Sequence, residues 1–303
     1  MLYQIIALLL WSSAFIAAKY TFTMMDPALM LLFRLGIASL LALPPCLRYW
    51  RQVEGRHWKG LLWMSFWNYV VVMMLEFVGA KTTSAASATT ILGLSPILTV
   101  FIGHFFFYDR AHWSVWLCGV AAFAGVALLI AGGGEGGEVG LWGSALVFAG
   151  NTVFCAVLRP TQDMIKKIGV SAFTSISMAV APLLCLPATL VFADSLHIDW
   201  NWKGTLGLVY LGVCCSWLAY NLWNIGMKTV PANVSGILSA LGPIFGAWLA
   251  VLILGERISA LSWLGIVLVV AATLAAVWVP KWLKRRQATG GFAMAEADMD
   301  LAE

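Results

Sequence analysis

The sequence predicts an all-α integral membrane protein, with ten transmembrane helices arranged as two inverted five-helix repeats. Three observations lead to this fold class. Of the 303 residues, 61% are hydrophobic and only 11% are charged, whereas a soluble domain needs more charge to cover its surface. The apolar residues fall into ten runs of membrane-spanning length. A set of matching residues also recurs at one constant spacing, which divides the chain into two related halves.

Each apolar run is close to the roughly 20 residues that cross a hydrocarbon core of about 30 Å. The runs lie at 2–20, 28–47, 60–79, 84–107, 113–131, 140–158, 171–192, 204–226, 232–254 and 261–280. The segments between them are too short to hold a soluble domain. The first run follows Met1-Leu2-Tyr3-Gln4, which contains no basic residue. We therefore interpret it as a retained helix rather than a cleaved signal peptide.

The Lys and Arg residues predict the orientation of the helices, because they are enriched in short cytoplasmic loops. With a cytoplasmic N-terminus, thirteen of the eighteen Lys and Arg residues fall on the cytoplasmic side. Four fall on the opposite side (Lys19, Lys81, Lys203 and Arg257), and Arg34 lies inside a span. Both termini are therefore expected in the cytoplasm, with a disordered cytoplasmic tail at 284–303.

Helices three to five match helices eight to ten at a constant offset of 147 residues. Lys81-Thr82 corresponds to Lys228-Thr229, Pro96 to Pro243, Asp109-Arg110 to Glu256-Arg257, and Trp116 to Trp263. Because each half has an odd number of spans, the second half must have the opposite orientation. We expect a first repeat at 1–131, a Gly-rich linker at 132–139 and a second repeat at 140–283. Inverted repeats are typical of secondary transporters, whose substrate site lies near the midplane; the alternative is a duplicated scaffold without a transport role.

Short motifs along the helices indicate a known family. Helix one contains Leu10-Trp11-Ser12-Ser13-Ala14-Phe15 followed by Lys19, and helix two contains Phe33-Arg34. Small residues lead into Ser95-Pro96 in helix four, and Leu254-Gly255-Glu256-Arg257 precedes helix ten. In this order and spacing, the chain resembles the EamA-type transporters of the drug/metabolite transporter (DMT) superfamily. The resemblance implies a ten-helix exporter of small metabolites that works without ATP. Family substrates include amino acids, nucleosides and toxic cations.

A polar and aromatic stripe on helix eight is the strongest indication of a substrate cavity. Trp217, Tyr220, Asn221 and Asn224 share one helical face, and an Asn amide that faced lipid would lose its hydrogen bonds. The stripe is therefore expected to face the interior, where it either lines a cavity or joins neighbouring helices. The matching face of helix three is apolar, with Val70, Met73, Met74 and Phe77. Further candidates for the lining are Trp11, Ser12, Ser13, Asn68 and Asn151.

Two charged residues, Arg34 and Glu76, lie within spans rather than at a span end, where charge is costly and usually serves a function. Arg34 lies about two turns into helix two. It could bind a substrate carboxylate through its planar guanidinium, or it could anchor a neighbouring helix carbonyl or Glu76. Glu76 lies near the end of helix three and is either a proton-coupling carboxylate or an interfacial charge near Lys81.

Pro96 and Pro243 lie at matching positions inside helices four and nine. Each removes one backbone hydrogen bond and favours a kink, and small neighbouring residues allow close helix approach. We expect these two helices to be the moving gates. Asp109 and Glu256 precede helices five and ten, where an acid near a helix N-terminus is stabilising, so we interpret them as structural.

These features predict a secondary active transporter that moves a small metabolite, such as an amino acid, out of the cell across the cytoplasmic (inner) membrane by alternating access. The alternatives are a multidrug or toxic-cation exporter, which needs a carboxylate in its cavity, and a membrane-embedded lipid enzyme. The four histidines are scattered and no phosphate-binding Gly-rich loop is present. We therefore expect no enzyme activity, no metal and no cofactor. Expected partners are lipid, a small-molecule substrate and protons as a candidate coupling ion, without nucleic acid; a monomer is compatible with the sequence.

Overall fold

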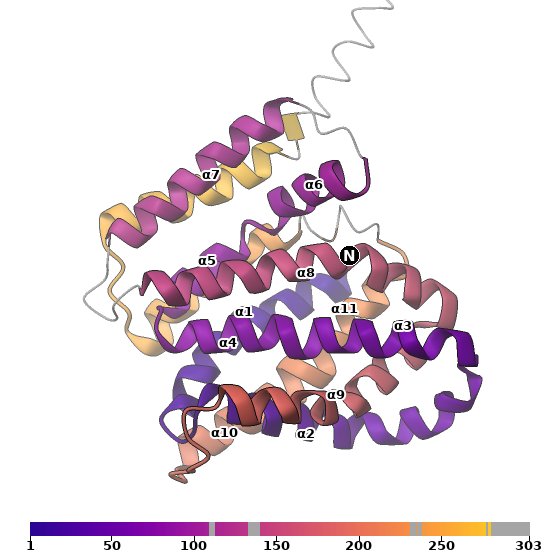
Figure 1. The fold of residues 1–303 in the computed structure, drawn as a ribbon. Coiled ribbons are helices and arrows are strands. Elements are labelled where there is room, and N and C mark those ends of the chain that lie inside the picture. Colours follow the sequence, from indigo (N-terminus) through magenta and orange to yellow (C-terminus); the bar gives the residue numbers. More distant parts are fainter. Residues whose placement is uncertain (109–112, 133–139, 231–234, 236–237, 277, 280–303) are drawn as a thin grey trace, which may run out of the picture.

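The described part of the chain forms an all-helical bundle (Figure 1). The computed structural model describes residues 1–108, 113–132, 140–230, 235, 238–276 and 278–279. Nearly all of the predicted linker at 132–139 and the whole predicted tail at 284–303 lie outside these residues. Within them, the structure has one isolated antiparallel bridge, between Met25 and Ile198, and no named strand.

Eight helices are long and apolar enough to cross a membrane. Four of them are single continuous α-helices: α1 (Leu2–Phe22), α7 (Trp113–Gly132), α8 (Leu141–Ile168) and α9 (Val170–Phe192). Another, α2 (Pro27–Tyr49), continues into a short 3₁₀ turn at Trp50–Gln52. The remaining three are composite: α3 (Gly55–Ser65) with α4 (Val72–Lys81), α5 (Ala85–Leu92) with α6 (Ser95–Phe106), and α10 (Trp202–Tyr210) with α11 (Ala219–Met227).

The last two predicted spans appear as shorter helices in the described residues. The run at 232–254 is represented by Gly242–Leu254, which contains α13 (Gly242–Leu249), and the run at 261–280 by Ala260–Ala276. The structure also extends α8 ten residues beyond the predicted end at residue 158. This extension carries polar side chains, two of which, Thr161 and Gln162, are buried. Helical backbone bonding does not require an apolar sequence, so hydropathy alone placed the end of this helix too early.

Polar and apolar side chains are distributed as expected for a protein surrounded by lipid. Large apolar side chains on the outside of the bundle are more than 70% exposed, including Leu40, Trp142, Leu183 and Val191. In contrast, the hydroxyl-bearing Thr90, Ser177 and Ser216 are fully buried. In water this arrangement would expose costly apolar surface, whereas lipid solvates it. The chain is a multi-pass membrane protein.

The three composite helices, and the segment that leads into α13, are interrupted at specific points. The segments Phe66–Val71 and Leu211–Leu218 are π-helical, a geometry that is rare and often found at functional sites. The helix formed by α5 and α6 breaks at Gly93 and Leu94, and a 3₁₀ turn at Ser239–Leu241 precedes α13. Pro96 and Pro243 each lie in the first turn of the helix after the break, where a missing backbone N–H costs little. The expected kinks are therefore helix interruptions.

Ion pairs and a helix cap hold together the bundle end that contains Lys81. The Lys81 Nζ atom lies 2.7 Å from Asp194 Oδ2 and 3.3 Å from Asp26 Oδ2. Its hydrogen bond holds the pKa of the Asp194 carboxyl below the usual value. Glu256 accepts hydrogen bonds from Ala85 N at 3.0 Å and Ala86 N at 3.3 Å. This acid therefore stabilises the start of α5, rather than the start of the helix that follows it in sequence. Asp109, its counterpart in the repeat, lies outside the described residues.

Candidate functional site

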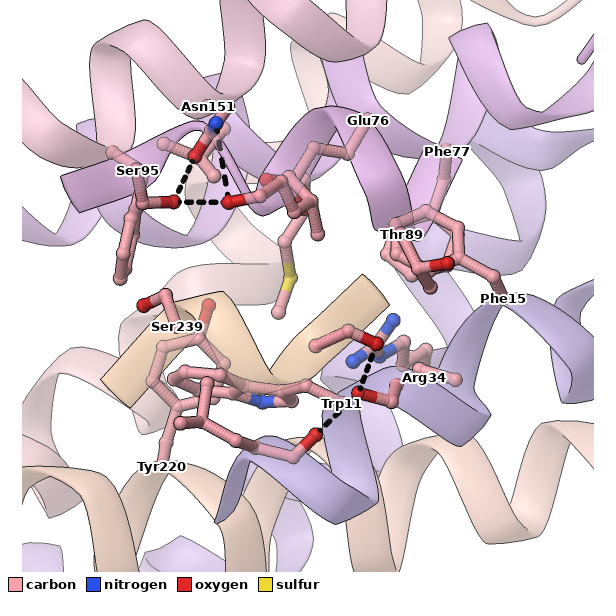
Figure 2. A pocket seen from close by; sticks show the side chains of 18 residues that line it. Trp11, Phe15, Arg34, Glu76, Phe77, Thr89, Ser95, Asn151, Tyr220 and Ser239 are labelled. Atoms are coloured by element: carbon pink, nitrogen blue, oxygen red, sulfur yellow. Dashed lines mark hydrogen bonds between the residues drawn. The ribbon is translucent and has the colours of Figure 1, made fainter. Parts of the chain in front are cut away.

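A cavity of about 80 Å³ lies between helices from both predicted repeats (Figure 2). It is smaller than the roughly 300–1,000 Å³ of sites for drug-sized ligands. Two of its lining residues, Arg34 and Glu76, carry charge, and the other lining side chains are uncharged. The lining consists of Leu8, Trp11, Ser12, Ala14, Phe15, Arg34, Val72, Met73, Glu76, Phe77, Thr89, Leu92, Ser95, Asn151, Phe154, Tyr220, Ser239 and Gly242. We call this space the central cavity.

Arg34 projects from α2 and is only 1% exposed. Its Nε atom donates to Ser216 Oγ at 2.6 Å, and Nη2 donates to the Cys215 carbonyl at 3.4 Å. The guanidinium carbon also lies 4.7 Å from the centre of the Phe77 ring, within cation–π range. The remaining nitrogen, Nη1, is buried and has no hydrogen-bond partner in the described part of the chain. The side chain is thus fixed in place while one nitrogen is left without an acceptor.

The partners of Arg34 belong to the π-helical segment Leu211–Leu218. A π-helical turn interrupts the regular backbone ladder, and here two side chains from other helices hydrogen-bond to one carbonyl. The Cys215 oxygen accepts from Arg34 and also from Trp11 Nε1, at 3.0 Å. The sequence did not indicate this irregularity, because a π segment has the same apolar composition as its neighbours.

Glu76 reaches the same cavity from α4. A methyl group on Gly150 of α8 would lie 2.9 Å from Glu76 Cγ, so this glycine provides the space for the acid. Among the described residues, no hydrogen bond or ion pair involves the Glu76 carboxylate, and no nitrogen of Arg34 lies within 4.0 Å of it. The Glu76 side chain therefore lines the central cavity, whereas Lys81 pairs with Asp26 and Asp194.

Asn151 and Ser12 line the cavity and also hydrogen-bond to the helix interruptions. Asn151 Nδ2 donates to the Ile91 carbonyl at 3.0 Å, and its Oδ1 accepts from Ser95 Oγ at 2.7 Å. Ser12 Oγ lies 3.4 Å from the Gly242 carbonyl, at the start of α13. The Ile91 carbonyl also accepts a hydrogen bond from Leu94 N at 3.1 Å, so Asn151 supplies it with a second donor at the end of α5.

Aromatic rings form one side of the central cavity. The ring centre of Trp11 lies 4.9 Å from that of Tyr220 and 5.1 Å from that of Trp223. Figure 2 shows Trp11, Tyr220 and Arg34 along one side of the cavity, with Asn151, Ser95 and Glu76 along the other. Tyr220 also borders a second, much smaller pocket of about 10 Å³. The aromatic cluster therefore lies between the central cavity and this second pocket.

Asn68 and Asn224 lie in that second pocket, outside the central cavity. Asn68 Nδ2 donates to Thr161 Oγ1 at 2.9 Å, and Asn224 Nδ2 donates to Thr174 Oγ1 at 2.9 Å. Both amides therefore join neighbouring helices. The Tyr69 hydroxyl in the same pocket is buried and has no hydrogen-bond partner in the described structure.

Three other predicted lining residues lie elsewhere. Trp217 and Asn221 line a lateral pocket between α2 and α9, and Asn221 Nδ2 bonds only the Trp217 carbonyl, at 2.6 Å. Ser13 lies in a groove beside Tyr210, with its Oγ 2.7 Å from the tyrosine hydroxyl. The helix-eight stripe is thus divided: Tyr220 contacts the central cavity, whereas the other three members do not.

Several lining residues were missing from the predicted set, notably Phe15, Thr89, Phe154 and Ser239. Helical spacing could have indicated two of them, because Phe15 follows Trp11 by four residues and Phe154 follows Asn151 by three. Met73 and Phe77, expected on the apolar face of helix three, do line the cavity. The described residues contain no group of three or more His, Cys, Asp or Glu side chains arranged to hold a metal ion.

Several proteins similar to this chain are named as uncharacterized transporters. The protein named YwfM of Bacillus subtilis, an uncharacterized transporter, is 26% identical over 249 residues, which cover 78% of this chain and 80% of that protein. An uncharacterized transporter of Haemophilus influenzae is 46% identical over 141 residues, covering 46% of this chain and 83% of the relative. YicL of Salmonella typhimurium, an uncharacterized inner membrane transporter, is 23% identical over 285 residues, or 90% and 93% of the two chains.

The fold also occurs in a known crystal structure, which matches 93% of this chain and 97% of its own with a TM-score of 0.68 at 20% identity. At this identity the likeness concerns the fold alone. A model of the EamA-like transporter family matches residues 1–131 and 136–278, which together make up most of the sequence. With apolar helices outside, a cavity that contains two charged side chains inside and this match over both halves, the chain belongs to the EamA-like transporter family.

Proposed function

We propose that the protein is a secondary active transporter that exports a small metabolite by alternating access, with the central cavity as its substrate site. The observation that supports this best is the central cavity itself, in which Arg34 keeps one donor unpaired and Glu76 makes no ion pair with a described residue. A purely structural core would pair such groups, because an unpaired buried charge is destabilising. Export is the direction that the family resemblance implies.

The helix irregularities support two inverted repeats. Two π-helical segments end at Val71 and Leu218, and the helices after the breaks begin at Ser95 and Gly242; a third π-helical segment, Ala250–Leu254, has no π-helical counterpart at this spacing. Both pairs are separated by the 147 residues found in the sequence. The packing is also reciprocal, because α4 packs on α8 while α11 packs on α1. Two halves of one shape can interconvert between states open to either side of the membrane.

The proposed orientation places both termini in the cytoplasm, as the distribution of Lys and Arg favours. Arg48 and Arg51 then lie on the cytoplasmic side, and Lys81 with Asp194 on the opposite side. Glu76 is the proposed coupling group, because it is the carboxylate that lines the cavity and it has no fixed partner. Pro96 and Pro243 are the proposed hinge positions, since a helix starts afresh at each.

A multidrug or toxic-cation exporter is a second candidate, and Glu76 in the cavity is the observation that favours it. Arg34 opposes it, because a buried guanidinium repels a simple cation. The lipid-enzyme alternative needs a cluster of acids, His or Cys, and the metal-type groupings it would use are not found among the described residues.

Transport into proteoliposomes tests the proposed function. Purified protein would be tested for flux of amino acids, nucleosides and quaternary cations, with and without a pH gradient. We expect flux of at least one panel member, lost in Trp11→Ala and retained in the matched variant Trp217→Ala. Trp11 lines the central cavity, whereas Trp217 lines the lateral pocket. A folded protein that moves no panel member, or equal loss of flux in both variants, would contradict the proposal.

A further inference from the structure

We infer that the lateral pocket binds an anionic phospholipid, with the lipid phosphate on Arg48 and an ester carbonyl of the lipid on Asn221. The pocket has a volume of about 470 Å³, and its lining includes Arg48, Ser171, Trp217 and Asn221. These residues come from α2, from α9 and from the helix that continues into α11. The inference does not rest on the proposed transport function, because the lateral pocket and the central cavity share no lining residue among those described.

The lateral pocket lies at the membrane interface. Arg48 and Tyr49 are at the end of α2, Ser171 is at the start of α9, and the apolar run 28–47 ends directly before Arg48. Along α2 the lining extends from Ala42 to Tyr49, which is two turns or about 10 Å. The interfacial layer on each side of a bilayer is roughly 5–8 Å thick. The pocket therefore faces the headgroup layer and the first carbons of the acyl chains, in the cytoplasmic leaflet under the proposed orientation.

The charge of the pocket calls for an anion. Among the residues that line it, Arg48 alone is charged, and no ion pair joins Arg48 to a described residue. The guanidinium carbon lies 5.6 Å from the centre of the Tyr49 ring, within cation–π range. This contact leaves the planar fork of N–H donors without a described acceptor, and a phosphate matches that fork. The exposed Ser171 hydroxyl adds a further donor to the same pocket.

Deeper in the membrane, the pocket offers a neutral donor. Asn221 lies six residues, or about 9 Å, before the end of α11 at Met227. Its Nδ2 atom donates one hydrogen to the Trp217 carbonyl at 2.6 Å. An amide nitrogen carries two hydrogens, so the second is free for an acceptor from outside the described chain. The ester carbonyls of a phospholipid are such acceptors, and they lie below the phosphate, as Asn221 lies below Arg48.

The apolar part of the pocket favours a lipid over a soluble anion. Trp217 is half-buried, Ala42 is 1% exposed, and Pro44 completes this wall. Next to the pocket on α2, the side chains of Leu43 and Leu47 are 45% and 64% exposed. A free phosphate would leave this apolar surface uncovered, whereas an acyl chain covers it. The order from the end of the bundle inward is thus cation, neutral donor and apolar wall, which matches the order phosphate, ester and acyl chain.

The test measures lipid binding to the purified full-length protein in a neutral detergent, by native mass spectrometry. The probes are phosphatidylglycerol and phosphatidylcholine with the same acyl chains, a phosphatidylglycerol with ether-linked chains, and water-soluble sn-glycerol 3-phosphate as a competitor. Phosphatidylglycerol should bind at least about fivefold more tightly than phosphatidylcholine, which is the gain from one basic residue near a membrane surface. It should also bind more tightly than its ether analogue, which lacks the ester carbonyls. The soluble phosphate should not compete.

A matched pair of variants assigns the phosphate contact. Arg48→Gln should weaken phosphatidylglycerol binding about fivefold, whereas Arg51→Gln should leave it unchanged. Arg51 makes the same kind of contact at the same end of the bundle, with its guanidinium carbon 5.9 Å from the centre of the Trp50 ring, but it does not line the lateral pocket. Both side chains are exposed, so both variants should fold. Asn221→Ala should abolish the preference for ester over ether lipid and keep the preference for phosphatidylglycerol over phosphatidylcholine.

Three outcomes would overturn the inference. Equal affinity for phosphatidylglycerol and phosphatidylcholine, or equal loss in Arg48→Gln and Arg51→Gln, would reduce the binding to a general attraction between anionic lipid and a basic surface. Competition by sn-glycerol 3-phosphate at the same concentration as the lipid would assign the site to a soluble phosphate. A preference for ester over ether lipid that survives in Asn221→Ala would remove Asn221 from the site.

Discussion

Asn151 and Asn221 are the same residue type on two transmembrane helices, and their surroundings give them different roles. Asn151 is buried and bonds the Ile91 carbonyl and the Ser95 hydroxyl at the helix interruption. Asn221 lies in the lateral pocket and bonds only a carbonyl of its own helix. Both were predicted to line a cavity, Asn221 from the argument about amides in lipid and Asn151 as a further candidate for the lining.

This difference predicts unequal effects on stability. Asn151→Ala removes two buried hydrogen bonds, to the Ile91 carbonyl and from the Ser95 hydroxyl, and each such bond contributes about 0.5–1.5 kcal/mol. Asn221→Ala removes a contact within one helix and should change the free energy of unfolding by no more than about 0.5 kcal/mol. Thermal unfolding of both variants in detergent measures the difference. Similar midpoints for the two would show that Asn151 does not support the interruption.

Residue by residue, the sequence predicted part of the cavity. Six predicted residues border it: Trp11, Ser12, Arg34, Glu76, Asn151 and Tyr220. Five do not: Ser13, Asn68, Trp217, Asn221 and Asn224. Helical periodicity places a residue on a face about a quarter-turn wide, which is not fine enough to decide between adjacent pockets. The π-helical segment Leu211–Leu218 also changes the direction in which the side chains after it, such as Tyr220, leave the helix axis.

At the scale of elements, close packing between α5 and α13 joins the two repeats. A methyl group on Gly246 of α13 would overlap the side chain of Thr89 on α5, whereas one on Gly36 of α2 would meet nothing within 4 Å. Glycine at position 246 is therefore required by the distance between the helices, and small residues serve this purpose widely in membrane proteins.

Gly246→Ala and Gly36→Ala form a matched pair that tests this contact. The first should destabilise the protein by about 1–3 kcal/mol, because α5 and α13 must move apart. The second should be neutral or stabilising by up to about 1 kcal/mol, because alanine favours the helix. Unfolding midpoints in detergent distinguish them. A neutral Gly246→Ala would mean that the two helices are not held at this distance.

For the whole molecule, the orientation in the membrane is the main untested prediction. In a background with the six cysteines replaced by alanine, Asp199→Cys and Arg51→Cys place single thiols at exposed positions near opposite ends of the bundle. A membrane-impermeant maleimide should label Asp199→Cys in intact cells, and Arg51→Cys only after the cells are permeabilised. This follows from the excess of Lys and Arg on the cytoplasmic side. The reverse pattern would place both termini outside.

The sequence by itself determined that this protein lies in a membrane and where its first eight spans begin, although the sixth ends ten residues later than predicted; the 147-residue spacing also predicts that its halves are related. These properties depend on the length of apolar runs and on the spacing of matching residues, and both can be read directly from the linear sequence. Only the tertiary structure decided which polar groups share the central cavity, that Glu256 stabilises α5, and that Arg34 and Glu76 border one space without pairing. Those outcomes depend on distances between helices far apart in sequence, and on π-helical turns and helix breaks that redirect side chains.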